Sequence, residues 1–146
     1  MNLFFEFLTA MICSISFAVL FNCPRRELIG GGLCGGLGWV IYTVIKDFTS
    51  SVSLSVLFAA IAVGLIGEAL AHSNKKPATV FIVPGIIPLV PGYGLYYTML
   101  TVIESGLGAA SSIGIETIFA AISIASGLVI SSALGKVFRK KGNRFS

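Results

Sequence analysis

One apolar stretch constrains the fold more than any other part of the sequence. Residues 77–104 read PATVFIVPGIIPLVPGYGLYYTMLTVIE, which is apolar enough to lie in a membrane yet contains four prolines. Inside a helix, each proline removes one backbone hydrogen bond and clashes with the carbonyl four residues earlier. Hydrocarbon offers no water to replace those bonds, so such a segment must be buried in protein or face a wet cavity. The carbonyls that lose a partner are those of Val80, Pro84 and Ile87.

The proline and glycine spacing predicts a break between Pro88 and Gly92. Pro91 suits the first turn of a second half-helix, which we expect over residues 93–104. The N-terminus of that half-helix carries partial positive charge and favours an anionic group. Discontinuous transporter helices place such ends near the bilayer midplane, where they bind substrate. We interpret the break as part of a substrate site; the alternative is a kink that only shapes packing.

The composition is that of an integral membrane protein. Of the 146 residues, 55% are hydrophobic and 11% are charged, with a mean hydropathy of +0.96, whereas soluble domains carry roughly 25% charged residues. We expect one all-α transmembrane domain over residues 1–146, a bundle of about five helices of ~20 residues. The predicted spans are 3–21, 28–45, 52–72, 78–104 (broken) and 113–135, with loops at 46–53 and 105–112 and a basic tail at 136–146.

The positive charges predict the orientation. With five crossings and an external N-terminus, nine of the ten basic residues fall on the inner side, and only Lys46 falls outside. Basic residues concentrate in cytoplasmic loops, so we expect a cytoplasmic membrane protein with a cytoplasmic C-terminus. The net charge of +4 thus reflects topology, and no nucleic-acid partner is expected. The inner basic residues outside the tail are Arg25, Arg26, Lys75 and Lys76.

Small residues predict where helices approach one another closely. The second span contains two GxxxG pairs, and pairs of this kind allow close helix contact in membranes. The alternative is a glycine face that lines a substrate path. A nucleotide-binding loop is excluded, because no strand precedes these glycines and no Gly-Lys-Ser/Thr follows. The predicted packing residues are Gly31, Gly32, Gly35 and Gly36 in the second span and Gly64 and Gly67 in the third.

Ionisable residues within a span are functional candidates by default. Glu68 shares one helical face with Gly64 and His72, and we regard Glu68 and Glu104 as candidate carriers of a coupling proton. Since Glu68 lies only one turn, roughly 6 Å, from the end of its span, an interfacial position is the alternative. We expect Glu6, near the outer end of the first span, to reach the interface.

Four aromatic residues with polar tips need partners or an interface. Tyr96 and Tyr97 follow Pro91 by one to two turns, which places their hydroxyls within the membrane. Buried hydroxyls usually form hydrogen bonds, so each is predicted to contact either substrate or a neighbouring helix. Trp39 and Tyr42 suit an aromatic belt at the far interface of the second span.

The sequence contains no motif typical of an enzyme or a metal site. HExxH and GxSxG are absent, the only histidine is His72, and the three cysteines lack ligand spacing. We therefore expect no catalytic residues, no metal and no cofactor.

Several motifs together resemble a known family. They are Phe21-Asn22-x-Pro24, the glycines of the second span, Gly64-x-x-Gly67, and Pro88-Leu-Val-Pro91-Gly92-x-x-x-Tyr96. With these residues the chain resembles, over nearly its whole length, the small membrane subunit of the threonine/serine exporter family. The resemblance implies export of small metabolites, usually threonine and serine, or dicarboxylates such as succinate in the two-chain type. It also implies a larger partner subunit.

Three functions are consistent with this sequence. In the first, the chain is an exporter subunit whose break contributes Pro88, Pro91, Gly92, Tyr96 and Tyr97 to a substrate path shared with a partner. In the second, it is a structural subunit that stabilises a larger membrane partner. In the third, it forms a homo-oligomeric channel.

Overall fold

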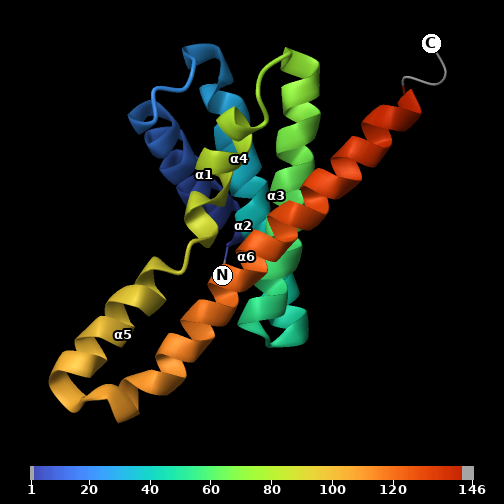
Figure 1. The fold of residues 1–146 in the computed structure, drawn as a ribbon. Helices are drawn as coiled ribbons and strands as arrows, with labels where there is room; N and C mark the ends of the chain where they lie inside the picture. The colour runs from blue at the N-terminus through green and yellow to red at the C-terminus, as the bar shows by residue number, and fades with distance from the viewer. Residues whose placement is uncertain (1, 143–146) are drawn as a thin grey trace.

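The computed structural model describes residues 2–142, with side chains up to residue 135, and the described chain is an all-α bundle without strands (Figure 1). Four helices are long and apolar enough to cross a membrane, and a bent pair adds a fifth. This confirms the predicted membrane bundle. The helices are α1 (Leu3–Leu20), α2 (Leu28–Thr49), α3 (Val52–Asn74), α4 (Thr79–Ile86), α5 (Gly92–Ser105) and α6 (Leu107–Gly142), with 3-10 turns η1 (Arg25–Glu27) and η2 (Ile87–Leu89).

The predicted break divides the fourth segment into α4–η2 and α5. The two halves are bent by 45° at the break. In Figure 1, α5 continues away from the end at which α4 begins, so the segment runs on rather than folding back. The prolines explain the break because η2 contains Pro88, and Pro91 immediately precedes α5.

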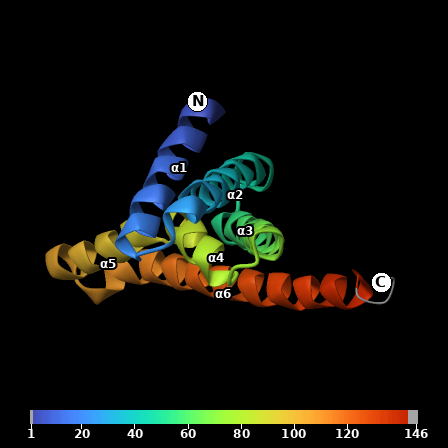
Figure 2. The same ribbon diagram turned by 90° about the horizontal axis from the view of Figure 1, so that it is seen from above.

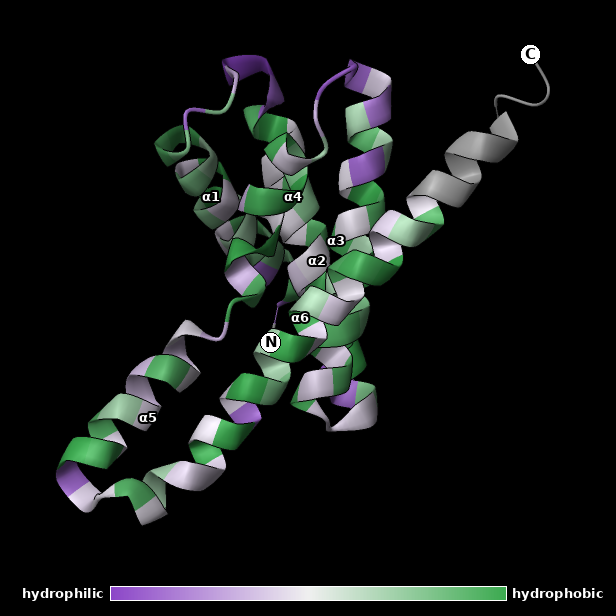
Figure 3. Cartoon of the chain, in the orientation of Figure 1, coloured by the Kyte–Doolittle hydropathy of each residue, from purple (hydrophilic) through white to green (hydrophobic). Residues whose placement is uncertain are grey.

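The turns separate into two ends of the molecule. The turns after α1 and after α3 lie at the same end as the C-terminal end of α6, and the α2–α3 and α5–α6 turns lie at the other (Figure 1). Figure 3 shows hydrophilic residues gathered at the turns after α1 and after α3. A hydrogen bond of 2.8 Å from the Asn74 amide to the Glu27 carboxylate, which is 8% exposed, joins these two turns.

Helix α2 lies between α1, α3 and α4 because its glycines leave room for their side chains. A Cβ at Gly32 would lie 2.5 Å from Ile15 of α1, and one at Gly31 would lie 3.2 Å from Pro84 of α4. On the α3 side, the buried Cys34 thiol donates a 3.2 Å hydrogen bond to the Val63 carbonyl. These close contacts bring α1, α3 and α4 against α2 at positions where α2 carries small residues. The resulting core comprises Cys34, Val56, Ala59, Ala60, Val63, Leu89 and Ile124.

Helices α3 and α6 cross through small residues on both sides. A Cβ at Gly127 would lie 2.8 Å from the Leu57 carbonyl oxygen and 2.8 Å from the Ala60 Cβ. One and two turns further along, Gly64 faces the Ser131 side chain and Gly135 faces the Glu68 carboxylate. Spacings of four residues on both helices allow their backbones to approach.

The first half of α6 pairs with α5 in a hairpin that projects from the other helices (Figures 1 and 2). The Thr117 side chain of α6 packs against Gly94 of α5, and the Thr98 side chain of α5 packs against Gly114 of α6. No residue of α5 is buried. The rest of the α5 surface is therefore left for lipid or for another protein.

Two predicted loops are shorter than expected. The 46–53 loop is reduced to Ser50 and Ser51, because α2 continues to Thr49. The 105–112 loop is reduced to Gly106, since α6 already begins at Leu107 rather than near residue 113. Gly106 has φ +84° and ψ 172°, so a single glycine reverses the chain. The predicted basic tail continues α6 to residue 142, and its residues 143–146 lie outside the described part of the chain.

We predict that Gly106→Ala destabilises the α5–α6 turn. The Gly106 conformation is essentially restricted to glycine and costs other residues about 1–3 kcal/mol; we expect the lower value, because this exposed turn has nothing within 4 Å of a Cβ to prevent relaxation. Thermal unfolding in detergent measures the effect. Gly108→Ala, also in open space, is the matched control and should be neutral or stabilising.

Candidate functional site

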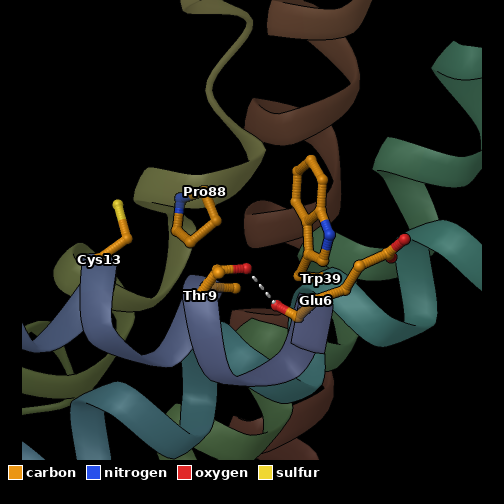
Figure 4. A pocket seen from close by; sticks show the side chains of 6 residues that line it. Glu6, Thr9, Cys13, Trp39 and Pro88 are labelled. Atoms are coloured by element: carbon orange, nitrogen blue, oxygen red, sulfur yellow. Dashed lines mark hydrogen bonds between the residues drawn. The ribbon is translucent and has the colours of Figure 1, made fainter. Parts of the chain in front are cut away.

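A pocket lies where α1, α2 and the break meet. It is lined by Glu6, Thr9, Ala10 and Cys13 of α1, Trp39 of α2 and Pro88 of η2, and its volume is about 350 Å³ (Figure 4). Small-molecule pockets range over about 300–1,000 Å³, so this pocket has room for a small metabolite.

The α1 side of the pocket follows directly from helical geometry. Glu6, Thr9, Ala10 and Cys13 occupy positions i, i+3, i+4 and i+7, which form one stripe along a helix. The opposite wall is Trp39, which α2 holds next to the closely packed Gly38 and Gly36. The lining is mostly apolar, and its polar residues are Glu6, Thr9, Cys13 and Trp39.

The backbone carbonyls at the break have hydrogen-bond partners despite the prolines. The Pro84 carbonyl accepts the Ile87 N–H, and the Ile87 carbonyl accepts the Val90 N–H at 3.2 Å. The Val80 carbonyl lies 3.8 Å from the Cys23 sulfur, the donor of a weak, long-range hydrogen bond. All three carbonyls that the sequence analysis identified have hydrogen-bond partners. The bundle therefore accommodates the break without leaving these carbonyls unsatisfied.

After the break, α5 begins as a free helix N-terminus. The Gly92 N–H donates to the Val90 carbonyl at 2.7 Å, and the Leu95 N–H to the Pro91 carbonyl at 3.1 Å. Among the described backbone hydrogen bonds, none uses the N–H groups of Tyr93 and Gly94. These two donors leave the partial positive charge of the half-helix unneutralised.

The Glu6 carboxyl group extends from α1 toward α2. One oxygen, Oε2, lies 2.8 Å from the Thr43 hydroxyl, and the other, Oε1, is buried without a partner among the described residues. The Thr43 hydroxyl also lies 3.1 Å from the Trp39 carbonyl oxygen. In Figure 4 the Glu6 side chain runs past Trp39. The Glu6 side chain thus packs between α1 and α2, and its predicted place near the membrane interface stays a prediction.

Trp39 lies in the pocket wall, and the aromatic belt of Trp39 and Tyr42 stays a prediction. Trp39 is ten residues from the end of α2, roughly 15 Å along the helix. Its ring packs against Tyr42, with centroids 5.1 Å apart, and the Lys46 Nζ lies 5.5 Å from the Tyr42 ring centroid.

Of the predicted substrate-binding residues, only Pro88 lines the pocket. Pro91 and Gly92 follow it in the chain, and a Cβ at Gly92 would meet nothing within 4 Å. Tyr96 is 66% exposed, and Tyr97 stacks on Tyr93 with ring centroids 5.5 Å apart. The two predicted tyrosines therefore lie on the projecting hairpin, outside the pocket.

The two predicted proton carriers also lie outside the pocket. The Glu68 carboxylate packs against Gly135 at the α3–α6 crossing, and Glu104 is exposed at the end of α5. The described hydrogen bonds include none between Glu68 and the exposed His72. Glu6, Thr9, Cys13 and Trp39 were not predicted as site residues, although the α1 stripe was visible in the sequence.

These features define the class of the protein. It is a multi-pass helical membrane protein with a mostly apolar pocket beside a discontinuous helix, an arrangement found in small-molecule transporters. Comparison with known families agrees: the family described as "Threonine/Serine exporter, ThrE" matches residues 6–134. The chain belongs to this family of threonine/serine exporter-type transporters.

One similar protein extends beyond the length of this chain. A protein of Haemophilus influenzae, described as an uncharacterized protein, is 28% identical over 104 residues. That match covers 71% of this chain and 35% of the relative, so the chain spans about a third of the relative's length. No solved structure matches the chain.

Proposed function

We propose that this chain is the small subunit of an exporter of threonine, serine or similar small amino acids, with the α1–α2–break pocket in its substrate path. The family assignment gives the transporter class. The observation that supports the substrate class is the pocket lining, which includes the acidic residue Glu6 and no basic residue. Such a wall favours the ammonium group of an amino acid and disfavours a dicarboxylate such as succinate.

The broken helix supplies the complementary end of the site. The N–H groups of Tyr93 and Gly94 stand at the start of α5, five residues after Pro88 of the pocket wall. We propose that they attract the substrate carboxylate, as helix N-termini favour anions. In this proposal, Pro91 and Gly92 begin α5 in a way that leaves the N–H groups of Tyr93 and Gly94 available to the substrate.

A partner subunit is the second part of the proposal. Helix α5 buries no residue, and it presents the hydroxyl-bearing Tyr93, Tyr96 and Tyr97 outward. In hydrocarbon, such hydroxyls are better satisfied by another protein than by lipid. The greater length of the Haemophilus influenzae relative also supports a larger subunit, with an oligomer of this chain as the alternative.

The orientation remains the one expected from the charges. Arg25, Arg26, Lys75 and Lys76 are exposed at the end where the turns after α1 and α3 meet. We propose that this end faces the cytoplasm and that the membrane is the cytoplasmic membrane.

Transport in vesicles tests the function. We expect labelled threonine and serine to exchange across vesicles that contain this chain with the larger subunit, whereas labelled succinate does not. The control is the larger subunit alone. Preferred exchange of succinate would overturn the substrate class, and full exchange by the larger subunit alone would favour a structural role for this chain.

A further inference from the structure

Four exposed cations gather at one end of the molecule, on the turns after α1 and after α3. Arg25 and Arg26 lie in η1, and Lys75 and Lys76 directly follow α3. All four side chains are exposed, and Figure 3 shows hydrophilic residues gathered at both turns. We call these four residues the basic cluster. Charges of one sign on a common surface attract ligands of the other sign.

A hydrogen bond joins the two halves of the basic cluster. Asn74 directly precedes Lys75, and Glu27 directly follows Arg26. The Asn74 side-chain amide donates to the Glu27 carboxylate at 2.8 Å. The turn after α3 is also fixed by its backbone, since the Lys75 N–H donates to the Ala71 carbonyl. The two pairs of cations are therefore held on either side of one tertiary contact.

The acidic residue beside the basic cluster does not neutralise it. Glu27 is only 8% exposed, and its Oε2 accepts the hydrogen bond from Asn74. Among the described side chains, no carboxylate forms an ion pair with any of the four cations. The positive charge of the cluster therefore faces outward without a counter-charge from the described part of the protein, and an external anion can supply one.

Apolar side chains adjoin the basic cluster. Helix α1 ends just before it, and Leu20 and Phe21 at that end are 70% and 47% exposed. Ile29, four residues after Arg25 in the same helical run, is 63% exposed and shares a helical face with Arg25. Cations beside exposed apolar chains suit the boundary between headgroups and hydrocarbon. This combination favours a ligand with a phosphate and acyl chains over a soluble anion or an acidic protein segment.

We propose that the basic cluster binds the phosphate of an anionic phospholipid headgroup, with the acyl chains along Phe21 and Ile29. Phosphate oxygens accept charge-assisted hydrogen bonds from arginine and lysine. A bound headgroup bridges η1 and the end of α3, as the Asn74–Glu27 hydrogen bond does, and so stabilises this end of the bundle. A zwitterionic lipid is disfavoured because the cluster repels the cation of its headgroup. Lipid binding here is independent of the exported substrate.

Native mass spectrometry of the detergent-solubilised protein tests this site. We expect phosphatidylglycerol to bind more tightly than phosphatidylcholine, and its affinity to fall about fivefold for each cation removed. The variants are the double substitutions Arg25→Gln/Arg26→Gln and Lys75→Gln/Lys76→Gln. Lys46→Gln is the matched control, because it removes the same charge near the other end of the molecule, and it should leave the affinity unchanged. Equal affinity for the two lipids, or an equal loss in Lys46→Gln, would overturn the site.

A variant that keeps all four cations separates a built site from diffuse surface charge. Asn74→Ala releases the Glu27 carboxylate, which then competes with the lipid phosphate for the cations, so the affinity for phosphatidylglycerol should fall. Ser73→Ala, at the neighbouring exposed position, is the control and should bind as the wild type does. Thermal unfolding without lipid checks that both variants are folded. Unchanged affinity in Asn74→Ala, or displacement of the lipid by inorganic phosphate at equal ionic strength, would overturn the proposal.

Discussion

Gly127→Leu is expected to prevent stable packing of α6 against α3. A Cβ at Gly127 would lie 2.8 Å from the Leu57 carbonyl oxygen, 2.8 Å from the Ala60 Cβ and 3.2 Å from the Ile61 nitrogen. Two of these three neighbours are backbone atoms, which cannot move aside as a flexible side chain can. Overpacking a core costs about 1–3 kcal/mol and occasionally more; we expect roughly 1 kcal/mol for Gly127→Ala and the upper end or beyond for Gly127→Leu.

Unfolding in detergent or bicelles measures both variants. Gly108 lies on the same helix and has nothing within 4 Å of a Cβ, so Gly108→Leu is a matched control. It should be neutral or stabilising, because glycine is about 1 kcal/mol less favourable than alanine in a helix. Equal stability of Gly127→Leu and Gly108→Leu would contradict the close α3–α6 crossing.

Local rules predicted the break well. The position of a break depends on where backbone donors are missing and where helices begin, and prolines determine both. The expected second half-helix at 93–104 corresponds closely to α5 at Gly92–Ser105. The hydrogen-bond partners of the freed carbonyls could not be predicted from the sequence. The contact of Cys23 with the Val80 carbonyl joins residues 57 positions apart and exists only because the turn after α1 lies beside α4.

The pocket beside the break was predicted only at Pro88, for a physical reason. Substrate-binding roles were assigned along the chain, from Pro88 to Tyr97, as though α5 faced the bundle. The 45° bend directs α5 outward instead, and residues of α1 and α2 line the pocket beside the break. Which helix faces a break depends on the glycine contacts that place α1 against α2, and these are tertiary.

Glu6 shows that position along a helix does not fix how a side chain is packed. The principle that ionisable residues within spans are functional drew attention to Glu68, although Glu68 lies one turn from the end of its predicted span. Glu6 was set aside for its closeness to the helix end. In the bundle it lies opposite Thr43, six residues before the end of α2, roughly 9 Å along that helix. The register between two packed helices, rather than distance from a terminus, determines how deep a side chain lies.

Thr9→Trp is expected to block export without unfolding the protein. Thr9 lines the pocket but is itself exposed, so an indole there extends into the pocket rather than into the core. Its hydroxyl bonds only to the Phe5 and Glu6 carbonyls of its own helix, so its loss costs little stability. We expect threonine exchange to fall by more than about tenfold, equivalent to about 1.4 kcal/mol.

The control for this variant lies three residues further along α1 and outside the pocket lining. Ile12 is 62% exposed and does not line the pocket, so Ile12→Trp adds the same indole to the same helix without filling the pocket. Vesicle exchange and thermal unfolding should be measured for both variants. Loss of exchange in Thr9→Trp alone, at equal stability, would place the substrate path beside the break. Equal exchange by both would place the path elsewhere. The outward face of α5 would then be the next surface to test, because it carries the exposed Tyr93, Tyr96 and Tyr97.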